Sequence, residues 1–200
     1  PIHDGLIYLL DHLPPCLHLV IASRTDPFSG LSRLRARGQL TELRAKDLRF
    51  NLEETESFLT RTMRLQMEKE DVLRLEARTE GWVSGLQLFA LSADPHGSKS
   101  WLTTLSGRHR DIADYLAEEV LPGQSEPVQT FLLQTAFLDQ LNGELCAAVT
   151  GHVDSQNMLT TLERQNLFIY PLDNERYWYR YHHLFTDFLR FFAQSKFNPE

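Results

Sequence analysis

The chain has 200 residues, 42% of them hydrophobic and 24% charged, which is the composition of an ordinary globular protein with room for one large domain or two to three small ones. Its 27 acidic residues outnumber its 20 basic residues and give a formal net charge of −7, which argues against a dedicated nucleic-acid binder. No run of about 18 apolar residues predicts a membrane span, so we expect a cytoplasmic protein without a membrane partner.

The two cysteines, Cys16 and Cys146, are far apart in the sequence. Neither belongs to a Cys-x-x-Cys pattern or to a Cys/His spacing typical of zinc sites, so we expect free thiols in a reducing compartment and no metal. The chain starts at Pro1, without the basic stretch or cleavage site of a secretory signal. The missing initiator methionine suggests a piece of a longer protein.

The first residues combine a helical pattern with an extended one. Apolar residues recur at a three-to-four spacing over 2–13 and predict a helix that Pro14 ends. Residues 17–22 (LHLVIA) are apolar on both faces except for His18, which is typical of a buried strand in a helix-covered parallel sheet. Arg24 would then lie near the carboxyl end of that strand, where open α/β sheets bind ligands.

Residues 31–122 are mostly helical in pattern. A short basic helix is predicted over 31–37, whereas 40–43 and 48–50 predict short strands or extended connections. Asn51 followed by Glu54 predicts the capped start of the next helix. Further helices, separated by glycines and prolines, are predicted at about 71–79, 82–92, 100–106 and 111–121. Together these helices predict a small bundle.

The last third of the chain shows a different order of elements. Helices are predicted over 126–138, 142–150 and 155–165, followed by extended segments over 167–172 and 177–181. Three helices and a hairpin describe a winged helix domain, and a final amphipathic helix follows it over about 183–194. The predicted fold is therefore mainly α, with a truncated α/β piece at its start.

Two candidate binding groups lie in the first half of the chain. The guanidinium of Arg24 would be able to donate a fork of hydrogen bonds to a phosphate, or it pairs with Asp26 as an ordinary surface arginine. Gly81 and Trp82 fall between two predicted helices. The indole ring either stacks on a base or closes the helical bundle as a core residue, which is the usual role of a large aromatic side chain.

A third candidate lies after the predicted hairpin, in the sequence Tyr181-His182-His183. A histidine at the start of a helix is able to donate to a phosphate oxygen, with help from the helix dipole. The ordinary alternative is a histidine that points to solvent or is satisfied in the core. Two adjacent histidines point in different directions, so they do not form a shared metal site without distant ligands.

Other activities are poorly supported by the sequence. The predicted third helix of the winged helix domain carries Arg164 but also Glu163, so we expect no direct DNA binding by this segment. The arginines and the lysine between residues 33 and 49 form a local basic excess that would contact a phosphate or an acidic neighbouring domain. No phosphate-cradling P-loop motif and no Ser-His-Asp signature occurs, so we do not expect an enzyme with its own active site.

Several ordered blocks of the sequence resemble one family of bacterial regulators. The blocks are LHLVIASRTDP (17–27), LRARGQL (34–40), EGW (80–82), LQL (86–88) and YHHLF (181–185). They resemble the large LuxR-type, MalT-like transcriptional regulators, which belong to the STAND class of signal-transduction ATPases. The resemblance extends over essentially all 200 residues.

This resemblance implies an order of domains. In the family, a P-loop ATPase core is followed by a helical domain, a winged helix domain, a helical-repeat sensor region and a LuxR-type helix-turn-helix. Residues 1–50 would then be the carboxyl-terminal part of the ATPase core, and 51–122 the helical domain. Residues 123–195 would be the winged helix domain, and 196–200 a frayed tail.

The resemblance also implies roles for the candidate residues. Arg24 would be the sensor arginine, and Gly81 and Trp82 would occupy the nucleotide-facing joint of the helical domain. His182 would match the histidine of the Met-His-Asp motif in related switch ATPases, although Tyr181 and His183 replace the flanking residues here. ATP or ADP would bind the intact regulator, whereas this chain alone is expected to bind neither tightly, because it lacks the Walker A and Walker B motifs.

The function implied is that of a regulatory segment that couples the ADP or ATP state to self-association and transcription. Its partners would be the other domains of the regulator: the P-loop core, the sensor repeats and the helix-turn-helix. An alternative is a freestanding interaction protein that docks on a related regulator. An independent enzyme is a third possibility, but the catalytic groups for it are not found in the sequence.

Overall fold

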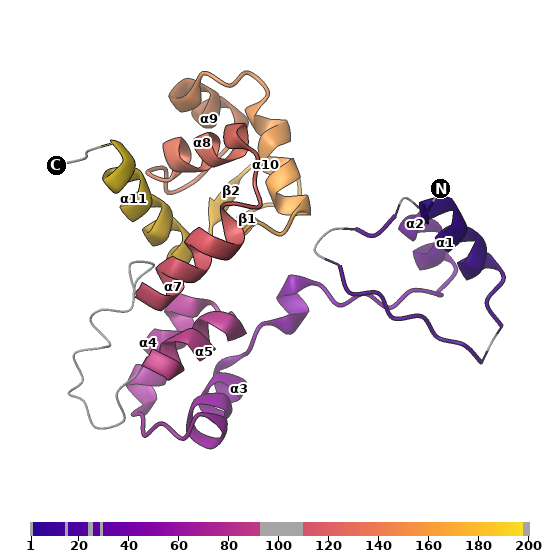
Figure 1. Ribbon diagram of the computed structural model, residues 1–200, viewed down its shortest axis with the longest axis horizontal. Helices are drawn as coiled ribbons and strands as arrows, with labels where there is room; N and C mark the ends of the chain where they lie inside the picture. Colours follow the sequence, from indigo (N-terminus) through magenta and orange to yellow (C-terminus); the bar gives the residue numbers. More distant parts are fainter. Residues whose placement is uncertain (1, 15, 24–25, 29, 93–109, 198–200) are drawn as a thin grey trace.

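The computed structural model describes residues 2–14, 16–23, 26–28, 30–92 and 110–197. Arg24 and the predicted helix over 100–106 lie outside these residues. Figure 1 shows an N-terminal part that lies to one side, a helical part at the bottom of the view, and a second group of helices with a small sheet above it. The division of the chain into domains at residues 50, 122 and 195 remains a prediction.

The N-terminal part contains two helices, α1 (Ile2–Asp11) and α2 (Leu31–Ala36), and a 3₁₀ turn at Ala45–Leu48. Helix α1 ends just before the two prolines, as its sequence predicts. The Arg33 guanidinium of α2 donates to the Asp11 carboxylate of α1 at 2.8 Å and joins the two helices.

The strand predicted over 17–22 is wrong. These residues have irregular backbone, and their apolar side chains face solvent, with Val20 91% exposed and Leu17 52% exposed. A strand needs a neighbour to pair its backbone groups, and no strand is assigned among the described residues of the N-terminal part. The expected α/β piece is therefore not shown. No strand is assigned at 40–43 or 48–50, so the structure favours connections over strands there, with Leu48 as the last residue of the 3₁₀ turn.

The helical part begins as predicted at Asn51. The Asn51 side chain accepts a hydrogen bond from the Glu54 N–H at 3.0 Å, and the Glu54 carboxylate accepts one from the Asn51 N–H at 2.9 Å, which confirms the capping box. The helices are α3 (Leu52–Ser57), α4 (Lys69–Thr79), α5 (Val83–Ser92) and α7 (Arg110–Tyr115). Helices α3 and α7 each continue into a π-helical turn, at Phe58–Thr62 and Leu116–Val120.

The winged helix domain is confirmed. Its three helices are α8 (Glu126–Thr135), α9 (Gly143–Thr150) and α10 (Ser155–Arg164). Strands β1 (Ile169–Pro171) and β2 (Tyr179–Tyr181) pair antiparallel, with Ile169 opposite Tyr181. The last helix, α11 (His183–Phe197), begins two residues after β2.

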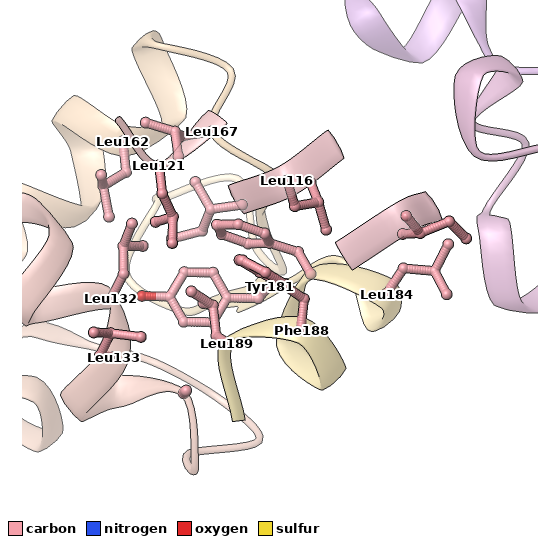
Figure 2. Packing of buried hydrophobic residues seen from close by; sticks show 14 of the residues in the cluster. Leu116, Leu121, Leu132, Leu133, Leu162, Leu167, Tyr181, Leu184, Phe188 and Leu189 are labelled. Atoms are coloured by element: carbon pink, nitrogen blue, oxygen red, sulfur yellow. The ribbon is translucent and has the colours of Figure 1, made fainter. Parts of the chain in front are cut away.

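One apolar core runs through the helical part and the winged helix domain. Helix α11 contacts both α8 and α4, so its apolar side chains face two parts of the chain. Figure 2 shows the centre of this cluster, where Tyr181, Leu184 and Phe188 pack near leucines from earlier helices. Continuous burial between the two parts stabilises a defined arrangement between them. No helix among the described residues has the length and apolarity that a membrane crossing requires.

Candidate functional site

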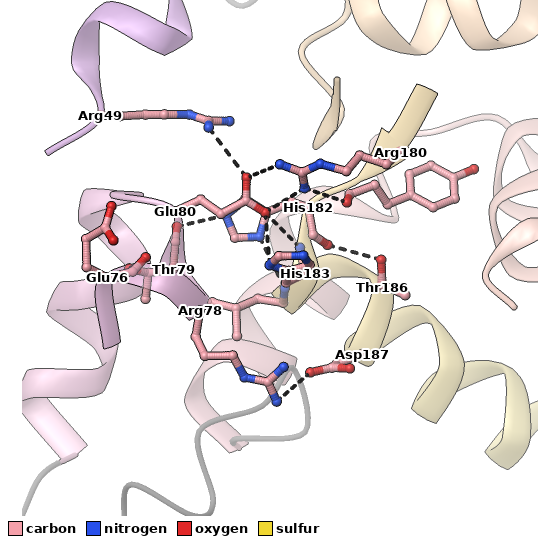
Figure 3. Close-up of polar contacts among 12 residues, drawn as sticks. Arg49, Glu76, Arg78, Thr79, Glu80, Arg180, His182, His183, Thr186 and Asp187 are labelled. Atoms are coloured by element: carbon pink, nitrogen blue, oxygen red, sulfur yellow. Dashed lines mark hydrogen bonds and ion pairs between the residues drawn. The ribbon is translucent and has the colours of Figure 1, made fainter. Parts of the chain in front are cut away.

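The candidate site lies where the turn between α4 and α5 meets the segment between β2 and α11 (Figure 3). We call residues 79–82 and 180–183 together the joint. Helix α4 ends at Thr79, and both Glu80 and Gly81 adopt positive φ angles of 49° and 69°, which turns the chain directly into α5. The turn therefore presents the last carbonyl of α4 and the Glu80 carboxylate to the winged helix domain.

Gly81 is required at this turn for two reasons. Its φ angle lies in the left-handed region, which favours glycine. A Cβ atom at Gly81 would also lie 2.2 Å from the backbone oxygen of Phe50. The Phe50 N–H donates to the Gly81 carbonyl at 2.9 Å, so the segment that enters the helical part passes directly over the joint.

His182 links the two parts of the chain through its ring. Its Nε2 atom lies 2.8 Å from the carbonyl oxygen of Thr79, and its Nδ1 atom lies 3.2 Å from the Leu184 amide nitrogen. Because a carbonyl only accepts and an amide N–H only donates, Nε2 carries the proton and Nδ1 accepts. The side chain is 1% exposed. Burial lowers the pKa of His182 to about 4, against the opposing effect of the Glu80 charge, so the ring is neutral at pH 7.

Glu80 is the most heavily bonded side chain of the joint. Its two carboxylate oxygens each accept from the Arg180 guanidinium at 2.8 Å, and the His183 backbone N–H donates to the same carboxylate at 3.2 Å. Arg49 contributes a longer ion pair at 3.5 Å. Burial acts to raise the pKa of Glu80, but the hydrogen bonds from Arg180 and the neighbouring positive charge outweigh it and lower the pKa to about 2.

Aromatic rings fill the space around the ion pair. The indole of Trp82 makes an edge contact with Phe168 at 5.1 Å between ring centroids, and it also contacts Tyr115 and His182. The Arg49 guanidinium lies 4.2 Å from the ring centroid of Tyr170. Trp82 thus packs across the boundary between the helical part and the winged helix domain. This position agrees with the second alternative from the sequence, a core residue that closes the helical bundle.

The structure brings together three of the four residues singled out from the sequence. Gly81, Trp82 and His182 meet at the joint, and Arg24 lies outside the described residues. Sequence reasoning missed Glu80 and Arg180 as a pair. Glu80 is the first residue of the EGW block and Arg180 directly precedes the YHHLF block, but neither position indicates that the two side chains pair.

Most of the basic excess between residues 33 and 49 is matched by nearby acids. Arg35 and Arg44 both pair with Glu42, and Arg44 also pairs with Asp26. These contacts lie within the N-terminal part. Among the residues that the structure describes, no group of three or more histidine, cysteine, aspartate or glutamate side chains is placed to hold a metal ion.

The three helices and hairpin define a winged helix domain packed on a helical part, and residues 117–199 match the family model of the MalT winged helix domain. The chain is 38% identical over 194 residues to the HTH-type transcriptional regulator MalT of Yersinia pestis (strain Pestoides F). It is 36% identical over 192 residues to the regulator of the same name from Vibrio campbellii (strain ATCC BAA-1116). Each match covers 94% of this chain and 21% of the relative. The chain is therefore MalT-like, with a winged helix domain of the MalT type.

Proposed function

We propose that the chain is the regulatory segment of a nucleotide-controlled transcriptional activator, and that the joint couples the ADP or ATP state to self-association. The observation that carries the proposal is His182, a buried neutral histidine whose single ring N–H joins the helical part to the winged helix domain. The MalT relatives, which are 36% and 38% identical to this chain, are transcriptional regulators, and this similarity supports the class of protein.

The ring N–H of His182 is a donor that suits a phosphate oxygen. The Arg180 guanidinium is engaged by the Glu80 carboxylate in this arrangement, so the proposal relies on the histidine. The His182 N–H has one acceptor in this structure, the Thr79 carbonyl. A phosphate oxygen at His182 would therefore compete with Thr79 for the same proton. Such competition would give two arrangements of the joint, and a ligand that favours one of them shifts the population toward it.

The remaining roles follow the family resemblance. Arg24 would act as the sensor arginine, and Gly81 and Trp82 would shape the turn that faces the nucleotide. A bound nucleotide would supply the phosphate charge. Hydrolysis and operator binding would belong to other domains of the regulator, since this chain carries no P-loop motif. We place the regulator in the cytoplasm, in agreement with its proposed role in transcription.

Replacing His182 with alanine in the full-length regulator is expected to raise transcription in the absence of inducer. In the proposed switch, the ADP-bound regulator is the closed, inactive form. The change removes the ring donor to the ADP phosphate, so it weakens this closed form. A reporter gene measures the basal level. His152→Ala is the matched control, because His152 is exposed and lies outside the joint. Unchanged basal transcription in the His182 variant would count against the proposal.

Calorimetry with ADP and ATP on this chain, beside a longer chain extended upstream through the P-loop, tests where the nucleotide is held. We expect tight binding by the longer chain only, because the joint supplies a few donors and the phosphate-cradling loop is elsewhere. Tight binding by the 200-residue chain would mean that it contains a complete nucleotide site, contrary to the proposal.

A second candidate function is favoured by the apolar side chains of the N-terminal part. Val20 is 91% exposed and Leu43 is 72% exposed, and exposed apolar groups of this kind mark docking surfaces. The alternative is a freestanding protein that docks on a related regulator. It predicts that the chain added in trans changes transcription by that regulator, whereas the first proposal requires the segment to be covalently part of it.

A further inference from the structure

We infer that Glu80 is the positioning residue of the joint: its carboxylate fixes the α4–α5 turn against the start of α11 and thereby holds the Thr79 carbonyl at His182. The inference concerns contacts within the chain and does not depend on nucleotide control. It assigns to Glu80 and Arg180 a role that neither the family match nor the sequence motifs provide.

The first argument is the convergence of three segments on one carboxylate. Arg180 comes from β2, the His183 N–H opens α11, and Arg49 lies just before α3. Glu80 is the acceptor common to all of them, and its side chain is 10% exposed. A carboxylate at the first N–H groups of a 15-residue helix also interacts favourably with the helix dipole. Its loss would leave these donors without their common acceptor.

The second argument is that contacts other than the Glu80 ion pair also hold the Arg180 side chain in place. Its guanidinium lies 5.5 Å from the ring centroid of Tyr170 and donates to the backbone oxygen of Tyr181 at 3.2 Å. These contacts restrict the rotamers of a long side chain. A guanidinium held in this way loses less conformational entropy when it forms the two-pronged ion pair, so the pair is more stabilising than a mobile surface pair.

The third argument is the spacing of the two contacts. Thr79 and Glu80 are neighbours on one side of the boundary, and Arg180 and His182 are two residues apart on the other. The ion pair and the histidine bond thus join the same two segments, which are 100 and 103 residues apart at these contacts. The apolar core joins the two parts without directional contacts, whereas the ion pair and the histidine bond together fix the orientation of the α4–α5 turn. Without the ion pair, the Thr79 carbonyl would lose its fixed position at His182.

Hydrogen exchange of backbone amides in the full 200-residue chain tests the inference. Glu80→Gln keeps the size of the side chain and removes its charge. We expect the amides of residues 182–184 to exchange about ten- to hundredfold faster, since a hydrogen bond to a charged group is lost. The amides of α9, which packs on α8 and α10, should keep their protection. Unchanged exchange at 182–184 would overturn the inference.

A matched control is available in the N-terminal part. Arg35 and Glu42 form an ion pair of the same two-pronged geometry, at 2.8 and 2.9 Å, but within one part of the chain. Glu42→Gln should leave exchange at 182–184 unchanged. If it speeds that exchange as much as Glu80→Gln does, the effect is a general consequence of removing an acidic charge, and the inference fails.

Variants of Arg180 provide the readout that separates positioning from general stability. Arg180→Gln should raise the amide exchange rate at residues 182–184 as much as Glu80→Gln does. Exchange in the double variant should be no faster than in either single variant, because both substitutions remove the same interaction. Additive effects would overturn the inference. If Glu80→Gln unfolds the whole chain, Arg180→Lys decides the question, because this variant keeps the positive charge and loses the two-pronged geometry of the guanidinium. A smaller increase in the amide exchange rate, confined to residues 182–184, supports the inference. No increase in that rate overturns it.

Discussion

Gly81→Ala is expected to lower the free energy of unfolding by about 2–4 kcal/mol, because it combines backbone strain with a steric clash. The left-handed φ of 69° disfavours any residue with a Cβ atom. The added methyl group would also lie 2.2 Å from the Phe50 oxygen, and that atom is backbone rather than the movable end of a side chain. Urea unfolding, monitored by circular dichroism, measures the loss of unfolding free energy.

Gly151→Ala is the control for this prediction. Gly151 ends helix α9 with a φ of 72°, but a Cβ atom there would meet nothing within 4 Å. The control therefore carries the conformational penalty alone, which is about 1–2 kcal/mol. Equal losses of unfolding free energy in the Gly81 and Gly151 variants would contradict the close approach of Phe50 to the α4–α5 turn.

The elements that the sequence predicts well are those with local signals. Helix α9 is an example: the Asn142 side chain accepts from the Leu145 N–H at 2.8 Å at its start, and Gly151 ends it. Both residues are visible as cap signals in the sequence. The winged helix domain consists largely of such elements in a fixed order, and it is confirmed by the structure and by the family match.

The strand predicted over 17–22 shows where local reasoning fails. Its apolar pattern describes which side chains would be buried if a sheet and covering helices were present. The described residues of the N-terminal part provide no such sheet, and Val20 is 91% exposed. A strand is stabilised by its neighbours, so a pattern within six residues cannot establish that it forms.

The joint was predictable in part. Gly81 and His182 lie in the EGW and YHHLF blocks that resemble the regulator family, and the sequence pointed to them for this reason. The pairing of Glu80 with Arg180 spans 100 residues and has no local signal, because each side chain alone resembles an ordinary exposed charge. Only the three-dimensional arrangement shows that the pair lies at the boundary between two parts of the chain.

Lowering the pH from 7 to 5 is expected to destabilise the chain by about 2 kcal/mol through His182. Its pKa is about 4 in the folded chain and about 6.5 in the unfolded chain, so the unfolded state binds more protons between these values. The contribution is fully present above pH 6.5 and is lost as the pH falls toward 4. Burial is the main cause; among the nearby charges, Glu80 opposes the lowering, and Arg49 and His183 add to it.

Glu80 acts in a separate pH range, which allows the two groups to be distinguished. Its pKa of about 2 in the folded chain lies below its ordinary value of 4.5, so its contribution is present above pH 4.5 and is lost as the pH falls toward 2. Between pH 7 and 5, the joint therefore responds through the histidine.

Urea unfolding at several pH values, with His182→Gln beside the wild-type chain, tests this assignment. The glutamine amide is able to donate to the Thr79 carbonyl but does not titrate, so we expect a flatter dependence of stability on pH between 7 and 5. The exposed His152 provides the control, because His152→Gln should keep the wild-type slope. If the His182 variant keeps that slope as well, a group other than the buried histidine carries the pH dependence, and the joint is not the acid-sensitive part of the chain.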